Sequence, residues 1–223
     1  MRPLTDFTAR RALVAAMLLF CLMAPAAAAQ QPLTREQASR ALVNPDPATR
    51  RAAAGQFGKV GRMDDVAALV KALRDRDPET RTLAEAAIWE IWGRSGDREI
   101  DELYLNGVEL MSYGVAGEAI KTFNIIISRK PDFAEAWNKR ATLYYSIGDY
   151  AKSLHDCDEV MKRNPLHFGA LAGYGLIYTQ MGQPARALDY FRRALKINPN
   201  MQGVSRNIEL LEQQGKEQRK NYI

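Results

Sequence analysis

Apolar and small residues recur with a fixed step of 34 positions between residues 100 and 201. The step relates large apolar positions, small positions, glycines and prolines: Leu103, Trp137 and Leu171; Gly107, Ala141 and Gly175; Gly114, Gly148 and Gly182; Pro131, Pro165 and Pro199. Two further sets follow the glycines, at Ala119, Ser153 and Ala187 and at Phe123, Cys157 and Phe191. Apolar positions within each copy have helical spacing. The pattern predicts three copies of a helical pair.

Each residue type in this pattern has a physical role in such a pair. Small residues in the first helix let the second helix approach closely, and large apolar residues fill the space between the two. A glycine ends the first helix because it adopts a left-handed backbone at little cost. A proline ends the second helix because it has no amide hydrogen. The predicted units are residues 100–133, 134–167 and 168–201, followed by a polar capping helix and tail at 202–223.

A different step, of 31 positions, relates two segments upstream: "ALVNPDPATRRAAA" (41–54) and "ALRDRDPETRTLAE" (72–85). Asp46 and Asp77 are expected to cap helices that begin at Pro47 and Pro78. Residues 55–73 are expected to form the turn and second helix of a helix-turn-helix unit. The polar segment "GRSGDRE" (93–99) is the predicted boundary between the two repeat types.

The three-copy pattern resembles the tetratricopeptide repeat of bacterial exported proteins, and residues 30–96 resemble HEAT repeats. The resemblance implies an all-α fold, a right-handed α-α superhelix whose first helices line a concave groove. Tetratricopeptide proteins commonly bind an extended peptide or a helix there. The family's groove positions fall here on Tyr104, Val108, Asn138, Thr142, Tyr145, Ala172, Leu176 and Thr179. Some relatives hold a chain terminus with a clamp of basic residues and asparagine, but of the matching places only Lys139 is basic, so that mode is not supported.

Two tryptophans, Trp89 and Trp92, lie three positions apart near the end of the last HEAT-like helix. We expect them to be buried, in the core or against the first tetratricopeptide hairpin, rather than to form an exposed ligand-binding patch.

Residues 1–29 have the features of a secretory signal peptide. Arg2, Arg10 and Arg11 precede the apolar run "ALVAAMLLFCLMA", and small residues follow at Ala27–Ala29. The run is too short to span a bilayer comfortably. We expect cleavage, a periplasmic or secreted location and no membrane span afterwards; an uncleaved segment that tethers a structural protein to the membrane is an alternative.

Composition narrows the class of partner. The chain has 223 residues, of which 47% are hydrophobic, and a formal net charge of +5. Removal of residues 1–29 takes away three arginines and one aspartate, which lowers the charge to +3. A net positive charge this small does not indicate a nucleic-acid partner. A protein or peptide partner is expected, and no cofactor; the partner's identity and the oligomeric state stay open.

One segment, "HDCD" at 155–158, contains several reactive side chains. On a helix, His155 and Cys157 point about 200° apart, so they cannot form a nucleophile–base pair. Cys157 takes the place of Phe123 and Phe191 and is expected in the core, whereas His155, Asp156, Asp158 and Glu159 are expected to form a solvated face. With two histidines and no G-x-S-x-G motif, neither a metal site nor catalytic residues are predicted. The sequence therefore predicts a non-enzymatic interaction scaffold; a thiol-dependent enzyme using Cys157 is the alternative.

Overall fold

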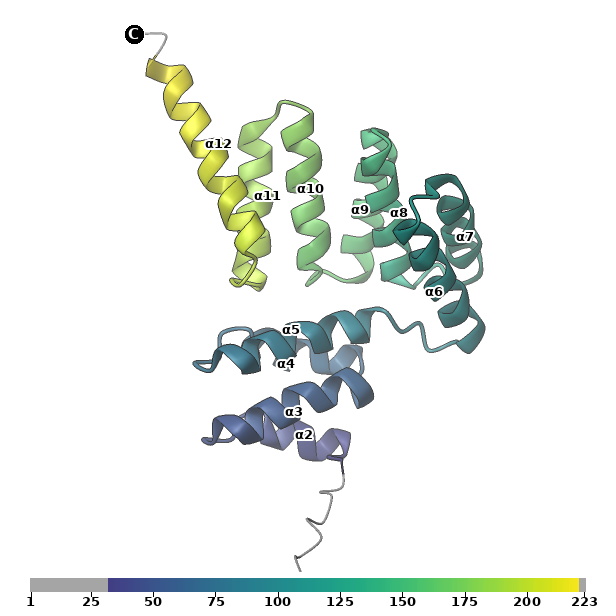
Figure 1. Cartoon of the computed structure of the whole chain (residues 1–223), viewed down its shortest axis with the longest axis vertical. Coiled ribbons are helices and arrows are strands. Elements are labelled where there is room, and N and C mark those ends of the chain that lie inside the picture. Colours follow the sequence, from purple (N-terminus) through teal and green to yellow (C-terminus); the bar gives the residue numbers. More distant parts are fainter. Residues whose placement is uncertain (1–31, 221–223) are drawn as a thin grey trace, which may run out of the picture. The chain divides into compact units, whose positions relative to one another are not determined.

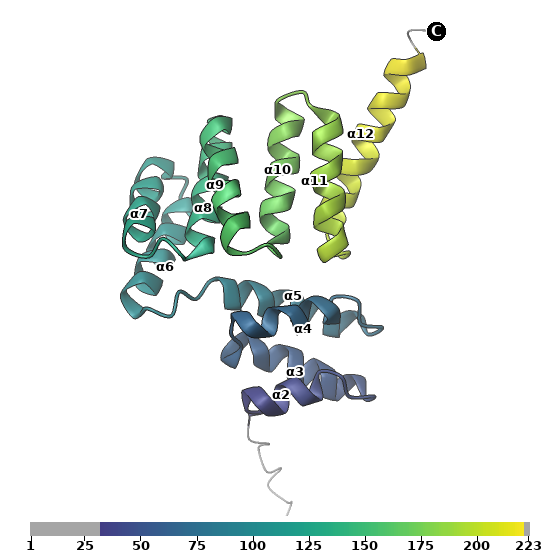
Figure 2. The ribbon, with the colours of Figure 1, turned by 180° about the vertical axis from the view of Figure 1, so that it is seen from behind.

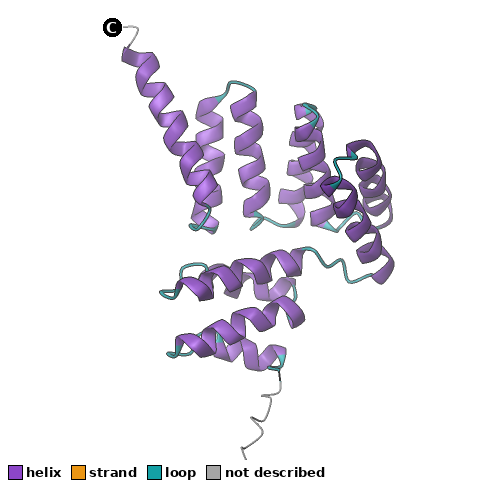
Figure 3. Ribbon diagram, in the orientation of Figure 1, coloured by secondary structure: helices purple, strands orange, loops and turns teal. Residues whose placement is uncertain are grey.

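The computed structural model describes residues 32–220, so the predicted signal peptide at 1–29 lies outside the described residues. Residues 33–220 belong to one compact unit. This part of the chain consists of helices joined by short loops, with no strand (Figure 3). The all-α solenoid expected from the repeats is confirmed. None of the helices in this part is long and apolar enough to cross a membrane.

Four helices form the N-terminal part: α2 (Arg35–Ala41), α3 (Pro47–Val60), α4 (Val66–Ala72) and α5 (Pro78–Trp92), with a short 3-10 helix, η1 (Met63–Asp65), before α4. The carboxylates of Asp46 and Asp77 accept hydrogen bonds from the first backbone amides of α3 and α5, and Pro47 and Pro78 occupy the first helical positions. The predicted caps are confirmed.

The pairing of these helices differs from the expectation. Residues 55–60 continue α3, and α4 comes before the second Asp-Pro segment instead of completing the first unit. Each Asp-Pro segment therefore lies between a short helix and a long one, in the pairs α2–α3 and α4–α5. The physical reason is that the Asp-Pro pair starts the long helix, while the Ala-Leu that precedes it ends the short one. The assignment to HEAT repeats stays a prediction.

Three helical pairs and a final helix follow: α6 (Arg98–Ser112) with α7 (Ala116–Arg129), α8 (Ala134–Ser146) with α9 (Tyr150–Arg163), α10 (Phe168–Gln180) with α11 (Pro184–Ile197), and then α12 (Gln202–Lys220) (Figure 1). Gly114, Gly148 and Gly182 have positive φ, between 67° and 79°, just after the first helix of each pair. The residue after each glycine donates to a carbonyl five residues back, which closes the helix end.

The two helices of a pair meet through complementary volumes. A Cβ added to Gly107 would lie 2.8 Å from the ring of Phe123, and one added to Gly175 would lie 2.3 Å from the ring of Phe191. The middle pair has Ala141 in the glycine position and Cys157 in the ring position, and both are buried in one cluster. A larger residue in the first helix is thus matched by a smaller one in the second.

The N-terminal helices pack against the ends of the repeat helices. Figures 1 and 2 show α5 running beneath the lower ends of α9, α10 and α11. The ring of Trp92 stacks on His167 at 4.2 Å, and Trp89 meets Phe168 edge-on at 5.2 Å. The expected burial is confirmed, since Trp92 belongs to the core cluster and Trp89 packs against it. The partners of the two rings are at the start of the third helical pair instead of in the first hairpin. The N-cap position of α10 places His167 and Phe168 directly over α5.

Candidate functional site

A small pocket lies between α8 and α10, the first helices of the second and third pairs. It encloses about 70 Å³. Its lining comprises Asn138, Ala141, Thr142, Tyr145, Ser153, Cys157, Gly169, Gly173, Leu176 and Ile177. We call it the groove pocket. Polar side chains from α8 and α9 stand beside apolar ones, most of which come from α10. This arrangement is suited to holding an apolar group with polar contacts at its edge.

Two glycines of α10 line the groove pocket, and one of them, Gly173, keeps it open. Gly173 has no side chain to occupy it, and a Cβ built there would lie 3.6 Å from the sulfur of Cys157. Cys157 contributes to the same effect, because a thiol takes the place that a phenylalanine ring fills in the other two pairs. Gly169 is needed for a different reason: a Cβ there would come within 2.6 Å of the Trp89 ring.

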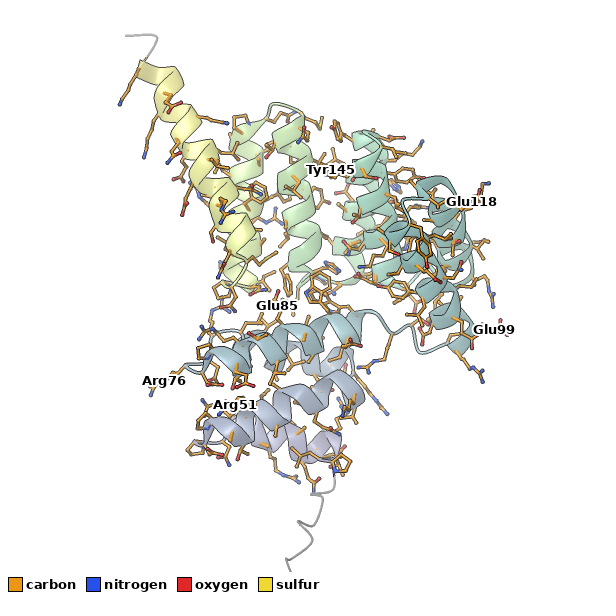
Figure 4. The ribbon with its side chains drawn as sticks, in the orientation of Figure 1. Arg51, Arg76, Glu85, Glu99, Glu118 and Tyr145 are labelled. Carbon is orange, nitrogen blue, oxygen red and sulfur yellow. The ribbon has the colours of Figure 1, made fainter. Side chains whose placement is uncertain are left out.

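Four of the residues expected in the groove come together here: Asn138, Thr142, Tyr145 and Leu176 all line the pocket. Leu176 is 37% exposed, and the hydroxyl of Thr142 donates to the carbonyl of Asn138 at 3.0 Å. Tyr145 lies at the C-terminal end of α8, between the ribbons of α8 and α10 in Figure 4.

The other four expected residues do not line this pocket. Ala172 is half-buried against the core cluster that contains Phe191. Tyr104 is buried against Phe123 and Phe133, where burial, with the charge of Glu135 nearby, raises the pKa of its phenol. Val108 is half-buried in the core of the first pair. The hydroxyl of Thr179 donates to the backbone carbonyl of Gly175 at 2.8 Å. Repeat phase alone does not separate these packing positions from open ones.

A buried polar cluster next to the groove pocket was not predicted. The carboxylate of Glu135, 2% exposed, accepts from Nε2 of His167 at 2.8 Å and from the amide of Asn138 at 3.1 Å, and pairs with Lys139 at 3.1 Å. Nδ1 of His167 accepts from the amide of Ala170 at 3.0 Å, so the imidazole is neutral and its Nε2–H donates to Glu135.

Opposing effects act on the pKa of Glu135. Burial alone would raise the pKa, but the hydrogen bond from His167 and the charge of Lys139 outweigh it, so the pKa lies below its ordinary value. The carboxylate is therefore ionised and holds Asn138 beside the groove pocket. Glu135 and His167 are 32 positions apart, and no motif in the sequence links them.

A wider pocket of about 430 Å³ lies where α5, α6 and α8 meet. Trp89, Tyr104 and Leu105 supply its apolar lining, together with Glu135 and Lys139. The ammonium of Lys139 lies 6.0 Å from the Trp89 ring centre, and Leu105 is exposed. Tyr104, one of the expected residues, thus lines this wider pocket.

The reactive side chains at 155–158 are not brought together at one place. Cys157 is 2% exposed, and burial raises the pKa of its thiol to about 12, so it is not a thiolate at neutral pH. His155 is exposed, with Nδ1 3.2 Å from Asp156. No group of three potential ligands among the described His, Cys, Asp and Glu residues is arranged to hold a metal ion.

Asp156 was expected on a solvated face, but the structure places it in the interior. It is 1% exposed, and its two carboxylate oxygens accept from Nε and Nη2 of Arg140 at 2.7 and 2.8 Å. The guanidinium of Arg140 lies over the Trp137 ring. Asp156 can be buried because α8 provides this bidentate partner.

Stacked helical pairs with pockets between their first helices define an α-α repeat protein. Comparison with known proteins identifies the repeat: residues 134–165 and 171–201 match tetratricopeptide repeat models. A TPR repeat-containing protein of Rhizobium etli is 31% identical over 150 residues, which cover 67% of this chain and 72% of that protein. The chain belongs to the tetratricopeptide repeat family.

Two further proteins are each similar to about half of this chain. Hsp70-Hsp90 organizing protein 1 of Glycine max is 29% identical over 113 residues, which are 49% of this chain and 20% of that longer protein. The crystal structure of the Sgt2 TPR domain from Aspergillus fumigatus matches 56% of this chain and 83% of that chain, with a TM-score of 0.52 at 20% identity. The similarity to the Sgt2 TPR domain concerns the fold alone.

Proposed function

We propose that the chain is a non-enzymatic interaction scaffold that binds a peptide or helix of a partner protein across the groove pocket. The observation that carries this proposal is the pocket itself, in which four predicted groove residues surround an apolar cavity kept open by Gly173. Membership of the tetratricopeptide family supports it, as does the likeness to an Hsp70-Hsp90 organizing protein.

The dimensions of the pocket restrict what it can hold. About 70 Å³ is little more than two water volumes, which admits one small apolar side chain and no drug-sized ligand. Ala141, Cys157 and Ile177 would contact that side chain, while Asn138 and Thr142 offer hydrogen-bonding groups to the partner's backbone. Anchoring by a single buried side chain with polar contacts around it is typical of peptide recognition.

Site-specific photo-crosslinking in the native cell tests this proposal. A benzophenone amino acid at Thr142 is expected to capture a defined partner, identified by mass spectrometry. Gly173→Leu fills the pocket and should abolish the adduct. Gly117→Leu is the matched control, since Gly117 is also helical but has open space around it, and it should leave the adduct intact. An adduct unaffected by Gly173→Leu would contradict the groove pocket as the binding site.

We further propose that the scaffold works in the bacterial envelope, on the basis of the signal-peptide features at residues 1–29. Cell fractionation should find the protein in the periplasm or outside the cell, and intact mass should correspond to a chain that lacks about 29 residues. A full-length mass in the membrane fraction would favour the tethered alternative.

A further inference from the structure

A third pocket, distinct from the groove pocket, lies at the meeting point of four segments. Trp92 comes from the end of α5, Arg94 from the loop before α6, Lys130 and Asp132 from the loop before α8, and Arg163 and Asn164 from the end of α9. The pocket encloses about 140 Å³, several water volumes. We call it the basic pocket.

Positive charge dominates the lining of the basic pocket. Arg94, Lys130 and Arg163 line it together with one carboxylate, that of Asp132, which is exposed and 3.4 Å from Lys130. The guanidinium of Arg94 donates to the backbone carbonyls of Gly58, Lys59 and Gly61, so its charge has no carboxylate partner. Arg163 is held in place by the carbonyl of Pro131 and by its ion pair with Glu159 at 2.6 Å, at the back of the pocket. Charges that are partly shielded from water act on a ligand more strongly than fully solvated ones.

Two residues of this lining each contain a buried donor that has no acceptor among the described residues. The donors are the indole Nε1–H of Trp92 and the side-chain amide nitrogen of Asn164, in residues that are 3% and 4% exposed. A buried donor without an acceptor costs about 1–3 kcal/mol. Both groups donate and neither can accept, so what satisfies them must be an acceptor, and the surrounding cations favour a negative one.

The residue equivalent to Asn164 in the next unit shows that an unpaired asparagine is not enough to define the site. Asn198 lies 34 positions after Asn164, and its amide nitrogen also lacks an acceptor among the described residues. Asn198 is not part of the basic pocket. An unpaired asparagine is therefore a trait of this place in the repeat, and the site consists of the combination of Asn164, the indole of Trp92, the cations and the cavity.

We propose that the basic pocket binds a carboxylate, either of a small organic acid or of an aspartate or glutamate side chain of a peptide. Its two oxygens would accept from Trp92 and Asn164, and the charge of Arg94, which has no carboxylate partner, together with that of Lys130 would attract it. The carboxylate of Asp132 at the rim disfavours a doubly charged phosphate more than a singly charged carboxylate. The groove pocket has no part in this site, so the two proposals stand or fall separately.

Indole signals in ¹⁵N–¹H NMR spectra of the purified protein provide a direct test. The chain has three tryptophans, and the indole of Trp137 already donates to the carbonyl of Pro131 at 3.0 Å. On titration with sodium acetate at constant ionic strength, the Trp92 signal should move and saturate on the order of millimolar. It should move further than the signal of Trp137, whose ring lies against Arg163. A parallel titration with sodium phosphate should saturate at higher concentration, if at all.

Matched aspartate variants show whether the shift of the Trp92 signal is caused by binding in the basic pocket. Asn164→Asp keeps the oxygen that accepts from the Leu166 amide at 3.2 Å but replaces the donor with a negative charge, so it should abolish the acetate response. Asn198→Asp makes the same change beside the Asn200 amide, 3.0 Å away, outside the pocket, and should leave the response unchanged. Equal responses in the two variants would overturn the proposal.

A second pair of variants removes a positive charge without introducing a negative one. Lys130→Gln should raise the acetate dissociation constant up to about fivefold, in line with loss of a partly exposed ion pair. Lys121→Gln removes an exposed lysine of α7 that pairs with Glu118 and should have no effect. Absence of any acetate response in the wild type, or tighter binding of phosphate than of acetate, would refute the proposal. A blocked peptide Ac-Ala-Glu-Ala-NH₂ that binds more tightly than acetate would identify a peptide as the source of the carboxylate.

Discussion

The complementary packing of glycine and phenylalanine within a pair leads to a sharp prediction at Gly175. In Gly175→Ala, the added methyl would lie 2.3–2.8 Å from three ring atoms of Phe191, far inside the 3.5–4.0 Å of a favourable carbon contact. Alanine favours a helix over glycine by about 1 kcal/mol, whereas overpacking a core costs about 1–3 kcal/mol. Because the overlap is deep, we expect the upper end of the cost and a net loss of about 2 kcal/mol.

Urea denaturation followed by circular dichroism measures this loss. With a slope of about 2 kcal/mol/M, the midpoint of Gly175→Ala should fall by about 1 M. Gly117→Ala is the control: it is an exposed helical glycine with nothing within 4 Å of the added carbon, and it should be neutral or slightly stabilising. Phe191→Cys should partly rescue Gly175→Ala, because the double variant has the volumes of Ala141 and Cys157 in the middle pair. A Gly175→Ala protein as stable as the wild type would refute the packing argument.

Three further predictions concern buried polar groups. Asp156→Ala should cost about 3–5 kcal/mol in urea unfolding, because it leaves the guanidinium of Arg140 without its buried partner; a loss below about 1 kcal/mol would contradict this. Cys157, with a pKa raised to about 12, should resist iodoacetamide at pH 7.5 until urea unfolds the chain, and rapid alkylation of the native protein would support the thiol-enzyme alternative. The lowered pKa of Glu135 means that its ionised form stabilises the fold above about pH 4.5, so the stability advantage of wild type over Glu135→Gln should shrink as the pH falls from 5 to 3; a constant difference would disagree.

Trp137 shows how far helix phase predicts burial. Its place in the repeat predicts a core position whose loss would cost about 3–5 kcal/mol. In the structure the ring is half-buried between the guanidinium groups of Arg140 and Arg163, 4.9 and 4.7 Å from its centre, and its indole donates to Pro131. Part of the ring surface thus contacts side chains that reach water, and a smaller loss, about 2 kcal/mol, is expected for Trp137→Ala.

Features set by neighbouring residues were predictable from the sequence. The helix ends at Gly114, Gly148 and Gly182 follow from a single residue's freedom to adopt positive φ, and the caps at Asp46 and Asp77 from a carboxylate beside free amides. Contacts between helices depend on how the pairs stack, and these were largely missed. The packing of Trp89 and Trp92 on His167 is an example, since it joins positions about 75 residues apart.

The spacing of residues within a helical pair predicts contacts that the repeat step of 34 does not. Gly107 faces Phe123, and Gly175 faces Phe191, each across 16 positions. In the middle pair, Ala141 faces Cys157 across the same 16 positions. The residues just before these two, Arg140 and Asp156, are also 16 positions apart and form an ion pair. Their ion pair was therefore accessible from the sequence once facing positions had been identified. Glu135 and His167 follow no such rule, because they link the starts of two neighbouring pairs.

The groove pocket arises from departures in single units of the repeat. Each helical pair of a solenoid contacts mainly its neighbours, so a change of volume in one pair leaves the others in place. In the middle pair, Ala141 with Cys157 replaces glycine with phenylalanine, and Gly173 adds no side chain from the next pair. The volume lost at Cys157 exceeds the volume gained at Ala141, and the difference lies on the side that faces Gly173. A binding cavity can therefore form between two units while the stacking that defines the fold is preserved.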